Sequence, residues 1–460
     1  MSAAPAVALP CVESIADRAM VAPRYTSYPP ATAFGPQTDR LAKSELARLG
    51  KDRAPLSLYV HVPFCRSLCW YCGCNVTISR NADRGDAYVD TIATEMVRVA
   101  EALGTAAPVT EVSLGGGSPN FLRPAALTQL ATAIGRYFAI TPDARRSIEL
   151  DPRATTPEQI DALAAAGWNT VSIGVQDFDL GVQEIIGRHQ SVAETTALVK
   201  AVRAAGVDDL NMDLIYGLPR QTEASMAVTL DEVIALAPDR IALFGYAHVP
   251  DMRPQQRMLE KKGRLPDRYE RAALVVAASE RLRAAGYVAL GLDHFAKPTS
   301  RLARAAAEGR MTRNFQGYAE RLADAVIGVG ASSISSTPRA HWQNHSEVAA
   351  WSEALAAGGL PVHRGLALSH DDRIRGDAIT TLMCTGELDL AALDRRWEID
   401  SQAYFADALT ALREDADLAE LDPATRTVRA TPLGRVLIRN VCARFDRYHT
   451  PGTRRGSATV

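Results

Sequence analysis

The sequence predicts an α/β protein in which a parallel sheet, open or closed into a barrel, precedes a mostly helical tail. From Pro55 to about Lys297, short runs rich in β-forming residues alternate with amphipathic helical stretches. Such alternation indicates parallel strands joined by crossover helices. Four of the seven cysteines lie in one decapeptide directly after the first of these runs. Beyond Pro298 the alternation ends and helical patterns dominate.

The predicted strands and helices alternate along the core. The strands are expected at residues 56–63, 110–114, 147–151, 170–175, 209–215, 241–247 and 287–293. The helices are expected near 84–103, 124–138, 156–166, 192–205, 223–236 and 267–285. The last helix is amphipathic, because Leu274, Val275, Ala278 and Leu282 recur at helical spacing. We expect an arm at 1–50, a core at 51–300, a connector at 301–364 and a helical domain at 365–460.

Composition limits the classes of function. The chain has 460 residues, of which 47% are hydrophobic and 23% charged, as is typical of a soluble globular protein of two or three units. The net charge of −2 gives no basic field for nucleic acid or an anionic membrane. No apolar run reaches the ~18 residues of a membrane span, and the N-terminus lacks the basic start of a secretory signal. We therefore expect a cytoplasmic protein, and a monomer.

The cysteine-rich decapeptide carries the strongest signal. Cys65, Cys69 and Cys72 follow a predicted strand at spacings of four and three, and Cys74 comes two residues later. Three thiolates can hold an iron–sulfur cluster and leave one of four irons open, as a catalytic zinc keeps an open position. A zinc knuckle would need a second ligand pair some 12–20 residues on, and none follows. A disulfide does not suit a cytosolic chain. The scattered cysteines, which we interpret as structural, are Cys11, Cys384 and Cys442.

Polar or glycine-rich residues follow every predicted strand. Catalytic and ligand-binding residues lie at the carboxyl ends of parallel strands, so these residues are expected on one edge of the sheet. Any one of them alone has an ordinary structural interpretation, such as a salt-bridged carboxylate or a packing histidine. The segments are Gly115–Pro119, Glu149 with Asp151–Arg153, Gly174–Phe178 with Arg188, Asn211–Pro219, Gly245–His248 and Asp293–Phe295.

Two further regions lie outside this pattern. The segment Pro23–Pro30 has prolines that favour extended backbone, and it is either a linker or an arm that covers a site. The tail combines two or three helices with a short hairpin, which suggests a winged-helix-like unit. Its charges of both signs are interspersed, which argues against DNA binding.

The cysteine spacing resembles that of radical S-adenosylmethionine (SAM) enzymes, and most of the chain resembles the oxygen-independent coproporphyrinogen III oxidase family. The motifs that carry the resemblance are Pro23–Pro29, Cys65–Cys74, Gly115–Gly117, Glu149–Arg153, Gly174–Phe178, Asp213–Pro219, Asp293–Phe295 and Arg313–Tyr318. The resemblance implies a partial, TIM-like (β/α) barrel with an N-terminal arm and a winged-helix-like C-terminal domain.

The same resemblance implies cofactors and their ligands. Cys65, Cys69 and Cys72 would bind a [4Fe–4S] cluster, while Cys74 is needed for activity. Cys74 either points away from the cluster or is its fourth ligand. The SAM contacts implied are Tyr59, Tyr71, Gly116, Gly117, Ser118, Gln176, Arg188, Asp213 and Ala247. A second SAM would touch Glu149, Phe315, Gln316 and Ile334.

The implied reaction is a radical oxidative decarboxylation in anaerobic heme biosynthesis. Two propionates of coproporphyrinogen III would become vinyl groups, giving protoporphyrinogen IX, with an electron donor for the cluster and an unidentified acceptor. We expect Arg24 and Arg313 to meet substrate carboxylates and Tyr25 and Tyr28 to cover the tetrapyrrole. Two alternatives are a heme-binding carrier of the same superfamily and an enzyme that opens or methylates a tetrapyrrole.

Overall fold

A continuous, curved sheet forms the centre of the computed structural model, which describes residues 8–104, 107–450 and 456–460. Its sheet order is β11-β12-β10-β9-β8-β7-β6-β3-β15-β16-β17-β18-β2. The six strands predicted first are parallel neighbours within it. They are β3 (Leu56–Val62), β6 (Pro108–Gly116), β7 (Ala139–Leu150), β8 (Thr170–Gln176), β9 (Asp209–Tyr216) and β10 (Arg240–Gly245). The α/β prediction is thus confirmed.

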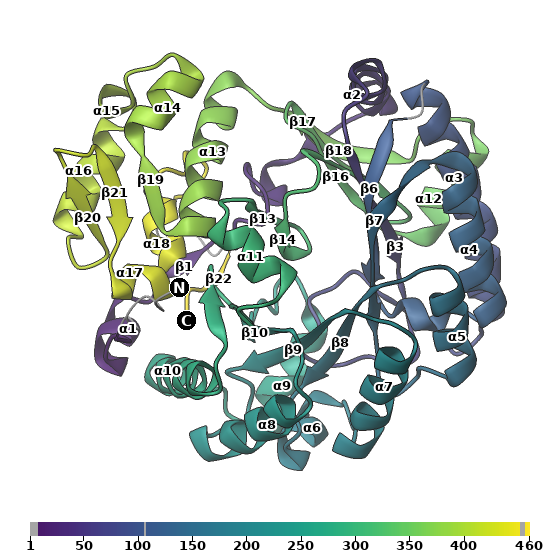
Figure 1. Ribbon diagram of the computed structural model, residues 1–460, viewed down its shortest axis with the longest axis horizontal. Coiled ribbons are helices and arrows are strands. Elements are labelled where there is room, and N and C mark those ends of the chain that lie inside the picture. Colours follow the sequence, from purple (N-terminus) through teal and green to yellow (C-terminus); the bar gives the residue numbers. More distant parts are fainter. Residues whose placement is uncertain (1–7, 105–106, 451–455) are drawn as a thin grey trace.

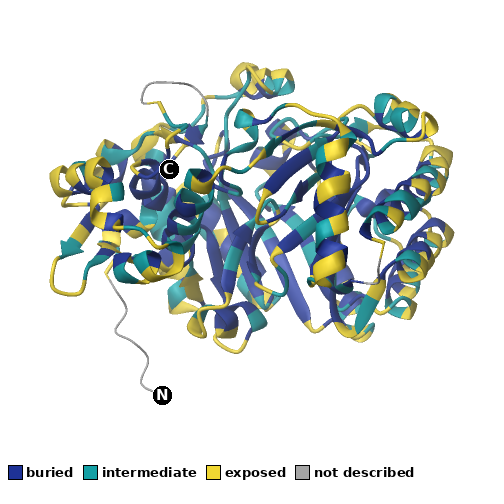
Figure 2. Cartoon of the chain, turned by 90° about the horizontal axis from the view of Figure 1, so that it is seen from above, coloured by how far each residue is buried: buried dark blue, intermediate teal, exposed yellow. Residues whose placement is uncertain are grey.

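Helices cover the outer face of these parallel strands (Figure 1). They are α3 (Asp83–Leu103), α4 (Pro124–Tyr137), α5 (Pro157–Ala165), α7 (Val192–Ala204), α8 (Glu223–Ala235) and α10 (Arg268–Ala284). The short helices α6 (Leu180–Ile186) and α9 (Arg257–Lys262) instead pack beside Trp70 and Tyr71. Capping boxes define several starts, as at Thr156 with Gln159 and at Asp267 with Glu270. The sheet is buried, whereas the helices expose their outer side (Figure 2). Apolar side chains between the two layers form the main core.

The seventh predicted strand, 287–293, is present but shorter, and it does not pair directly with β10. It comprises β11 (Val288–Leu290), after which the chain turns back into β12 (His294–Ala296), and β12 pairs antiparallel with both β10 and β11. Gly291 adopts a left-handed φ of +58° at this reversal, and a Cβ there would overlap the Tyr318 ring. The additional parallel strand is β15 (Ala325–Val329), on the far side of β3.

Beyond β15 the sheet continues antiparallel. Its strands there are β16 (Ile334–Ser336), β17 (Ala340–Asn344), β18 (Val362–Ala367) and the short β2 (Gly35–Pro36). The accompanying helices are α2 (Asp39–Asp52), α11 (Arg301–Ala307) and α12 (Val348–Ala356). A separate hairpin, β13 (Met311–Asn314) with β14 (Gly317–Glu320), carries the predicted loop at Phe315 and Gln316.

The tail packs helices around a three-stranded antiparallel sheet of order β19-β21-β20. Its helices are α13 (His370–Thr385), α14 (Leu390–Trp397), α15 (Ser401–Tyr404), α16 (Ala406–Glu414), α17 (Pro432–Val436) and α18 (Ile438–Ala443). Its strands are β19 (Glu387–Asp389), β20 (Ala419–Asp422) and β21 (Thr427–Ala430). The last two of these helices, α17 and α18, are short and follow one another directly.

The arm is built into this tail. It holds α1 (Val12–Arg18) and β1 (Val21–Ala22), which pairs antiparallel with β22 (Ser457–Ala458). Tyr25 and Tyr28 belong to the same apolar cluster as the tail helices. Within the described residues, no helix is both long and apolar enough to span a membrane.

Candidate active site

The cysteine loop follows β3, where the sequence predicts it. Its two ends are joined by β4 (Phe64–Cys65) and β5 (Thr77–Ile78), which pair in parallel. Thr77 N donates to Pro63 O at 2.6 Å, and Ser79 N donates to Cys65 O at 2.9 Å. These bonds close the loop at its base and place its thiols at the carboxyl edge of the sheet.

Each of the three predicted ligand thiols has a distinct surrounding. Cys65 Sγ lies 3.5 Å from Ser118 Oγ, and burial raises the pKa of this thiol to about 11. Cys69 Sγ accepts from Arg153 at 3.7 Å and from Arg188 at 3.6 Å. A hydrogen bond with the side chain of Cys74 lowers the pKa of Cys72 to about 7, outweighing burial. Two guanidinium groups therefore lie against the sulfur of Cys69.

This donor set fits an iron–sulfur cluster. The charges of Cys69 and Cys72 act on the thiol of Cys65, so the three sulfurs lie near one another, as ligands of one cluster would. Thiolates are the usual ligands of such clusters, whereas a hard cation prefers oxygen.

A segment after β10 holds the cysteine loop in place. It contains η3 (Pro254–Gln256), and its side chains donate to three successive carbonyls of the loop. These bonds run from Gln256 Nε2 to Tyr71 O at 2.9 Å, from Gln255 Nε2 to Cys72 O at 2.9 Å and from Arg253 Nε to Gly73 O at 2.8 Å. Gln256 also reaches Ala247 O at 3.1 Å, so it joins two predicted SAM contacts. Sequence reasoning missed this segment, because nothing local marks a contact about 180 residues away.

The glycine-rich edge after β6 packs tightly against the cysteine loop. Gly116 has a φ of +108°, and a Cβ there would lie 2.3 Å from the His61 ring. A Cβ at Gly117 would lie 2.6 Å from Phe64 O, which belongs to the backbone and has little freedom to move. Ser118 N donates to the same oxygen at 2.8 Å. The protein's own packing therefore already requires glycine here, before any ligand is considered.

Two half-buried carboxyl groups lie on β7 and β9, the strands on either side of β8. Partial burial and the charge of Asp213 raise the pKa of Glu149 to about 7, although Gly116 N donates to it at 3.2 Å. Burial also raises the pKa of Asp213, which accepts from Ser172 Oγ at 3.0 Å and from Asn211 Nδ2 at 2.8 Å. Glu149 can therefore change protonation state near neutral pH.

Arg188 connects the cysteine loop to the strand ends. One of its nitrogens donates to Gly174 O at 2.6 Å, and its guanidinium lies 3.4 Å from the carboxylate of Asp151. Gln176 at the end of β8 has a left-handed φ of +68°, an unusual conformation for a residue other than glycine. A Cβ at Gly174 would crowd both Gln176 and Arg188, so these predicted SAM contacts lie together.

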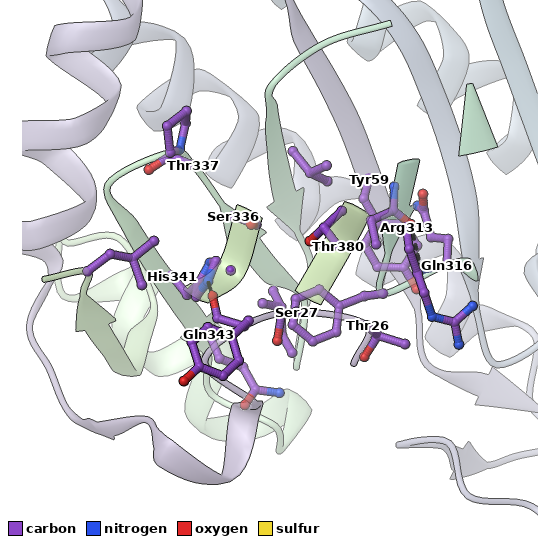
Figure 3. A pocket seen from close by; sticks show the side chains of 18 of the residues that line it. Thr26, Ser27, Tyr59, Arg313, Gln316, Ser336, Thr337, His341, Gln343 and Thr380 are labelled. Atoms are coloured by element: carbon purple, nitrogen blue, oxygen red, sulfur yellow. Dashed lines mark hydrogen bonds between the residues drawn. The ribbon is translucent and has the colours of Figure 1, made fainter. Parts of the chain in front are cut away.

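A cavity of about 640 Å³ opens between this edge and the tail. The predicted site residues that line it are Tyr28, Tyr59, Cys74, Gly116, Glu149, Arg313, Phe315, Gln316 and Ile334. Figure 3 shows Tyr59, Arg313 and Gln316 grouped on one side and His341 with Gln343 on another. The structure thus brings the residues assigned to a second SAM together with Tyr59 and Cys74. The other predicted contacts are absent from the described lining: Tyr71, Gly117, Ser118, Gln176, Arg188, Asp213 and Ala247.

His61 is a cavity residue that the sequence did not single out. Its Nδ1 lies 3.0 Å from Tyr59 Oη, and its Nε2 lies 3.2 Å from Asn75 O and 3.3 Å from Ser332 Oγ. Burial lowers the pKa of His61 to about 4, so the imidazole is neutral. Its only sequence signal is a polar residue within an otherwise apolar strand. It orients the Tyr59 hydroxyl.

The four predicted substrate contacts divide between two places. Tyr28 and Arg313 line the cavity. Arg24 instead donates to Gly245 O at 2.8 Å and lines a second cavity of about 660 Å³. Tyr25 is buried, and its hydroxyl donates to Asp446 at 3.1 Å. Two of the four predicted substrate contacts, Arg24 and Tyr25, therefore serve the junction between the sheet and the tail.

The comparisons with known proteins agree with this geometry. Residues 59–233 match the radical SAM superfamily. An oxygen-independent coproporphyrinogen III oxidase from Bradyrhizobium diazoefficiens is 40% identical, and the match covers 95% of this chain and 97% of that protein. The chain belongs to the oxygen-independent coproporphyrinogen III oxidase family. A family member from Escherichia coli is 38% identical over 93% of both chains.

A solved structure of the family has the same fold. It is a coproporphyrinogen III oxidase from Escherichia coli, described as a radical SAM enzyme. It superposes with a TM-score of 0.88 at 37% identity, covering 93% of this chain and 98% of that one. The radical SAM fold with its helical C-terminal region is thereby confirmed. Family membership implies a [4Fe–4S] cluster and SAM, which the three-cysteine loop fits.

Cys74 lies beside Cys72, because Cys74 N donates to Cys72 Sγ at 3.4 Å. Contact with the Cys72 side chain, the charge of Cys72 and burial together raise the pKa of the Cys74 thiol well above its ordinary value. The two expected roles of Cys74, a thiol that points away from the cluster and a fourth ligand, stay predictions. Cys74 is exposed and lines the cavity, so a protonated thiol faces whatever binds there.

Proposed function

We propose that the protein oxidatively decarboxylates two propionates of coproporphyrinogen III to vinyl groups, giving protoporphyrinogen IX in anaerobic heme biosynthesis. One observation carries the proposal. A large cavity with arginines in its wall opens directly beside a three-cysteine loop, in a chain that belongs to this oxidase family. The tetrapyrrole has four carboxylates, which arginine recognises through paired hydrogen bonds.

The chain's own residues would bind and orient the reactants. Cys65, Cys69 and Cys72 would hold the cluster, which together with SAM supplies one-electron, hydrogen-abstracting chemistry. Arg188 and its partner Asp151 fix the side of the loop that contains Cys69.

Two residues that line the cavity can act as proton donors. Glu149, with a pKa of about 7, accepts a hydrogen bond as a carboxylate and donates one as an acid. Cys74 keeps its proton because the pKa of its thiol is raised. Both can donate a proton or a hydrogen bond to a bound reactant. We therefore assign them to the reaction, whereas the cysteines before Cys74 serve the cluster.

We further propose that an external reductant and a separate electron acceptor complete the reaction. The cytoplasm is the fitting compartment, because its reducing poise keeps thiols free and all seven cysteines are free here. We propose a monomer, since one chain provides both the cysteine edge and the opposite cavity wall.

Product analysis under strict anaerobiosis tests the function. The reconstituted protein is incubated with SAM, a reductant and coproporphyrinogen III, beside a Cys69→Ala control. Release of CO2 with vinyl products is expected from the wild type alone. Tight heme binding without turnover would instead identify a carrier, and a methylated or ring-opened product would identify a different tetrapyrrole enzyme.

A further inference from the structure

The tail contributes one complete wall of the cavity. On α13, residues at positions i, i+3, i+4 and i+7 lie on one helical face, and this face lines the cavity. They are Arg373, Gly376, Asp377 and Thr380. The end of α14 adds Arg396 and Trp397 to the same wall. The same cavity is lined by Gly73 and Cys74 of the cysteine loop, so this wall and the cysteine edge border one space.

The two arginines of this wall are arranged around one indole ring. The guanidinium of Arg373 lies 5.0 Å from the centre of the Trp397 ring, and that of Arg396 lies 5.8 Å from it. Trp397 Nε1 donates to Asp377 at 2.8 Å, which fixes the ring. Contact with an aromatic face positions a guanidinium without using its N–H donors. In Arg373 those donors remain available to a ligand.

The carboxylates of the wall leave one arginine uncompensated. Asp377 pairs with Arg396 at 3.1 Å. The buried Asp372 pairs with Arg447 at 3.1 Å and accepts from Tyr448 at 2.9 Å. In the described part of the chain, no carboxylate lies within ion-pairing distance of Arg373. The wall therefore presents a net positive charge to the cavity.

We propose that Arg373, supported by Trp397 and Arg396, binds a propionate carboxylate of the tetrapyrrole that is retained in the product. This inference rests on the proposed function. Two of the four propionates survive the reaction, and oxidation takes place at the cysteine edge. A carboxylate held at the opposite wall orients the macrocycle while a reacting propionate faces that edge. Arg373 is thus a substrate-binding residue contributed by the tail.

Steady-state kinetics of Arg373→Ala test the assignment. The expected result is a KM for coproporphyrinogen III raised about tenfold or more, as follows from losing a charge-assisted pair, with kcat nearly unchanged. SAM cleavage without substrate should match the wild type, which shows that the cluster is intact. Arg373→Lys should recover part of the loss, since it keeps the charge but not the planar fork.

The matched control is Arg395→Ala, one residue before Arg396 on the same helix. Arg395 lies 3.8 Å from Asp389 and is absent from the cavity lining. An unchanged KM in Arg373→Ala, or an equal rise in Arg395→Ala, would overturn the inference. Binding of the stable oxidised coproporphyrin III is measured in parallel. If the wild type binds it but releases no CO2, the proposed function fails, while the effect of Arg373→Ala on that affinity still decides the inference.

Discussion

Gln256 Nε2 donates to the carbonyl oxygen of Tyr71 at 2.9 Å, although the two residues are 185 positions apart. The amide of Gln256 is almost fully buried and also reaches Ala247. It therefore links the cysteine loop to the end of β10. The cluster ligands depend on this distant segment for their position.

Replacing Gln256 by Ala should weaken cluster retention. Two carbonyls lose their donor, and an unsatisfied buried polar group costs about 1–3 kcal/mol. We expect a lower iron content after anaerobic reconstitution and faster loss of the cluster to a chelator. Absorbance at the cluster band measures the rate of that loss. Gln129→Ala is the control, because Gln129 bonds to Asp90 on the exposed side of α4. Equal cluster lifetimes in both variants would contradict the role of Gln256.

Replacing Arg188 by Ala should lower the reduction potential of the cluster. The guanidinium lies 3.6 Å from Cys69 Sγ, and a nearby positive charge stabilises the more negative reduced state. We expect a decrease on the order of 60 mV, which is a tenfold change in a one-electron equilibrium. A redox titration followed by electron paramagnetic resonance measures it. Arg203→Ala, which removes the surface partner of Asp239, should leave the potential as it is.

Glu149→Gln should change how stability depends on pH. The pKa of Glu149 is about 7 in the folded protein, above its ordinary value of 4.5, so the folded state binds more protons than the unfolded state between these values. The favourable contribution of Glu149 to the free energy of unfolding is fully present below pH 4.5 and is lost as pH rises through 7. Between pH 5 and pH 8, the free energy of unfolding of the glutamine variant should rise by up to about 3 kcal/mol relative to that of the wild type.

Thermal unfolding at both pH values measures this difference. Glu95, whose pKa burial also raises to about 7, keeps its own contribution in both proteins. Parallel stability curves for wild type and Glu149→Gln would show that the carboxyl of Glu149 titrates normally.

Gly117→Ala should disturb the cysteine loop. The new Cβ would lie 2.6 Å from Phe64 O, and this oxygen belongs to the strand that carries Cys65. We expect lower cluster content and a lower Tm. Gly135→Ala is the matched control, because no atom lies within 4 Å of its Cβ position inside α4. That change should raise stability by about 0.5–1 kcal/mol. If Gly117→Ala retained its cluster to the same extent as Gly135→Ala, tight packing at the glycine-rich edge would be excluded.

Much of the core could be predicted because its signals are local. The strands β3 to β10 show apolar runs, and the helices between them show helical periodicity and capping residues. The β15 strand was missed because Gly328 and Gly330 interrupt its short apolar run. The strand predicted at 287–293 was drawn too long, because its apolar pattern does not reveal the reversal at Gly291.

The sequence by itself determined the parallel α/β core, the cysteine loop at its edge and the family, since spacing and periodicity are properties of neighbouring residues. Only the tertiary structure decided that Arg24 turns away from the main cavity, that Gln256 supports the cysteine loop and that Arg373 borders the same cavity as the cysteine edge. Each of these depends on contacts between residues far apart in the chain. Such contacts arise only when burial and hydrogen bonding bring distant elements together.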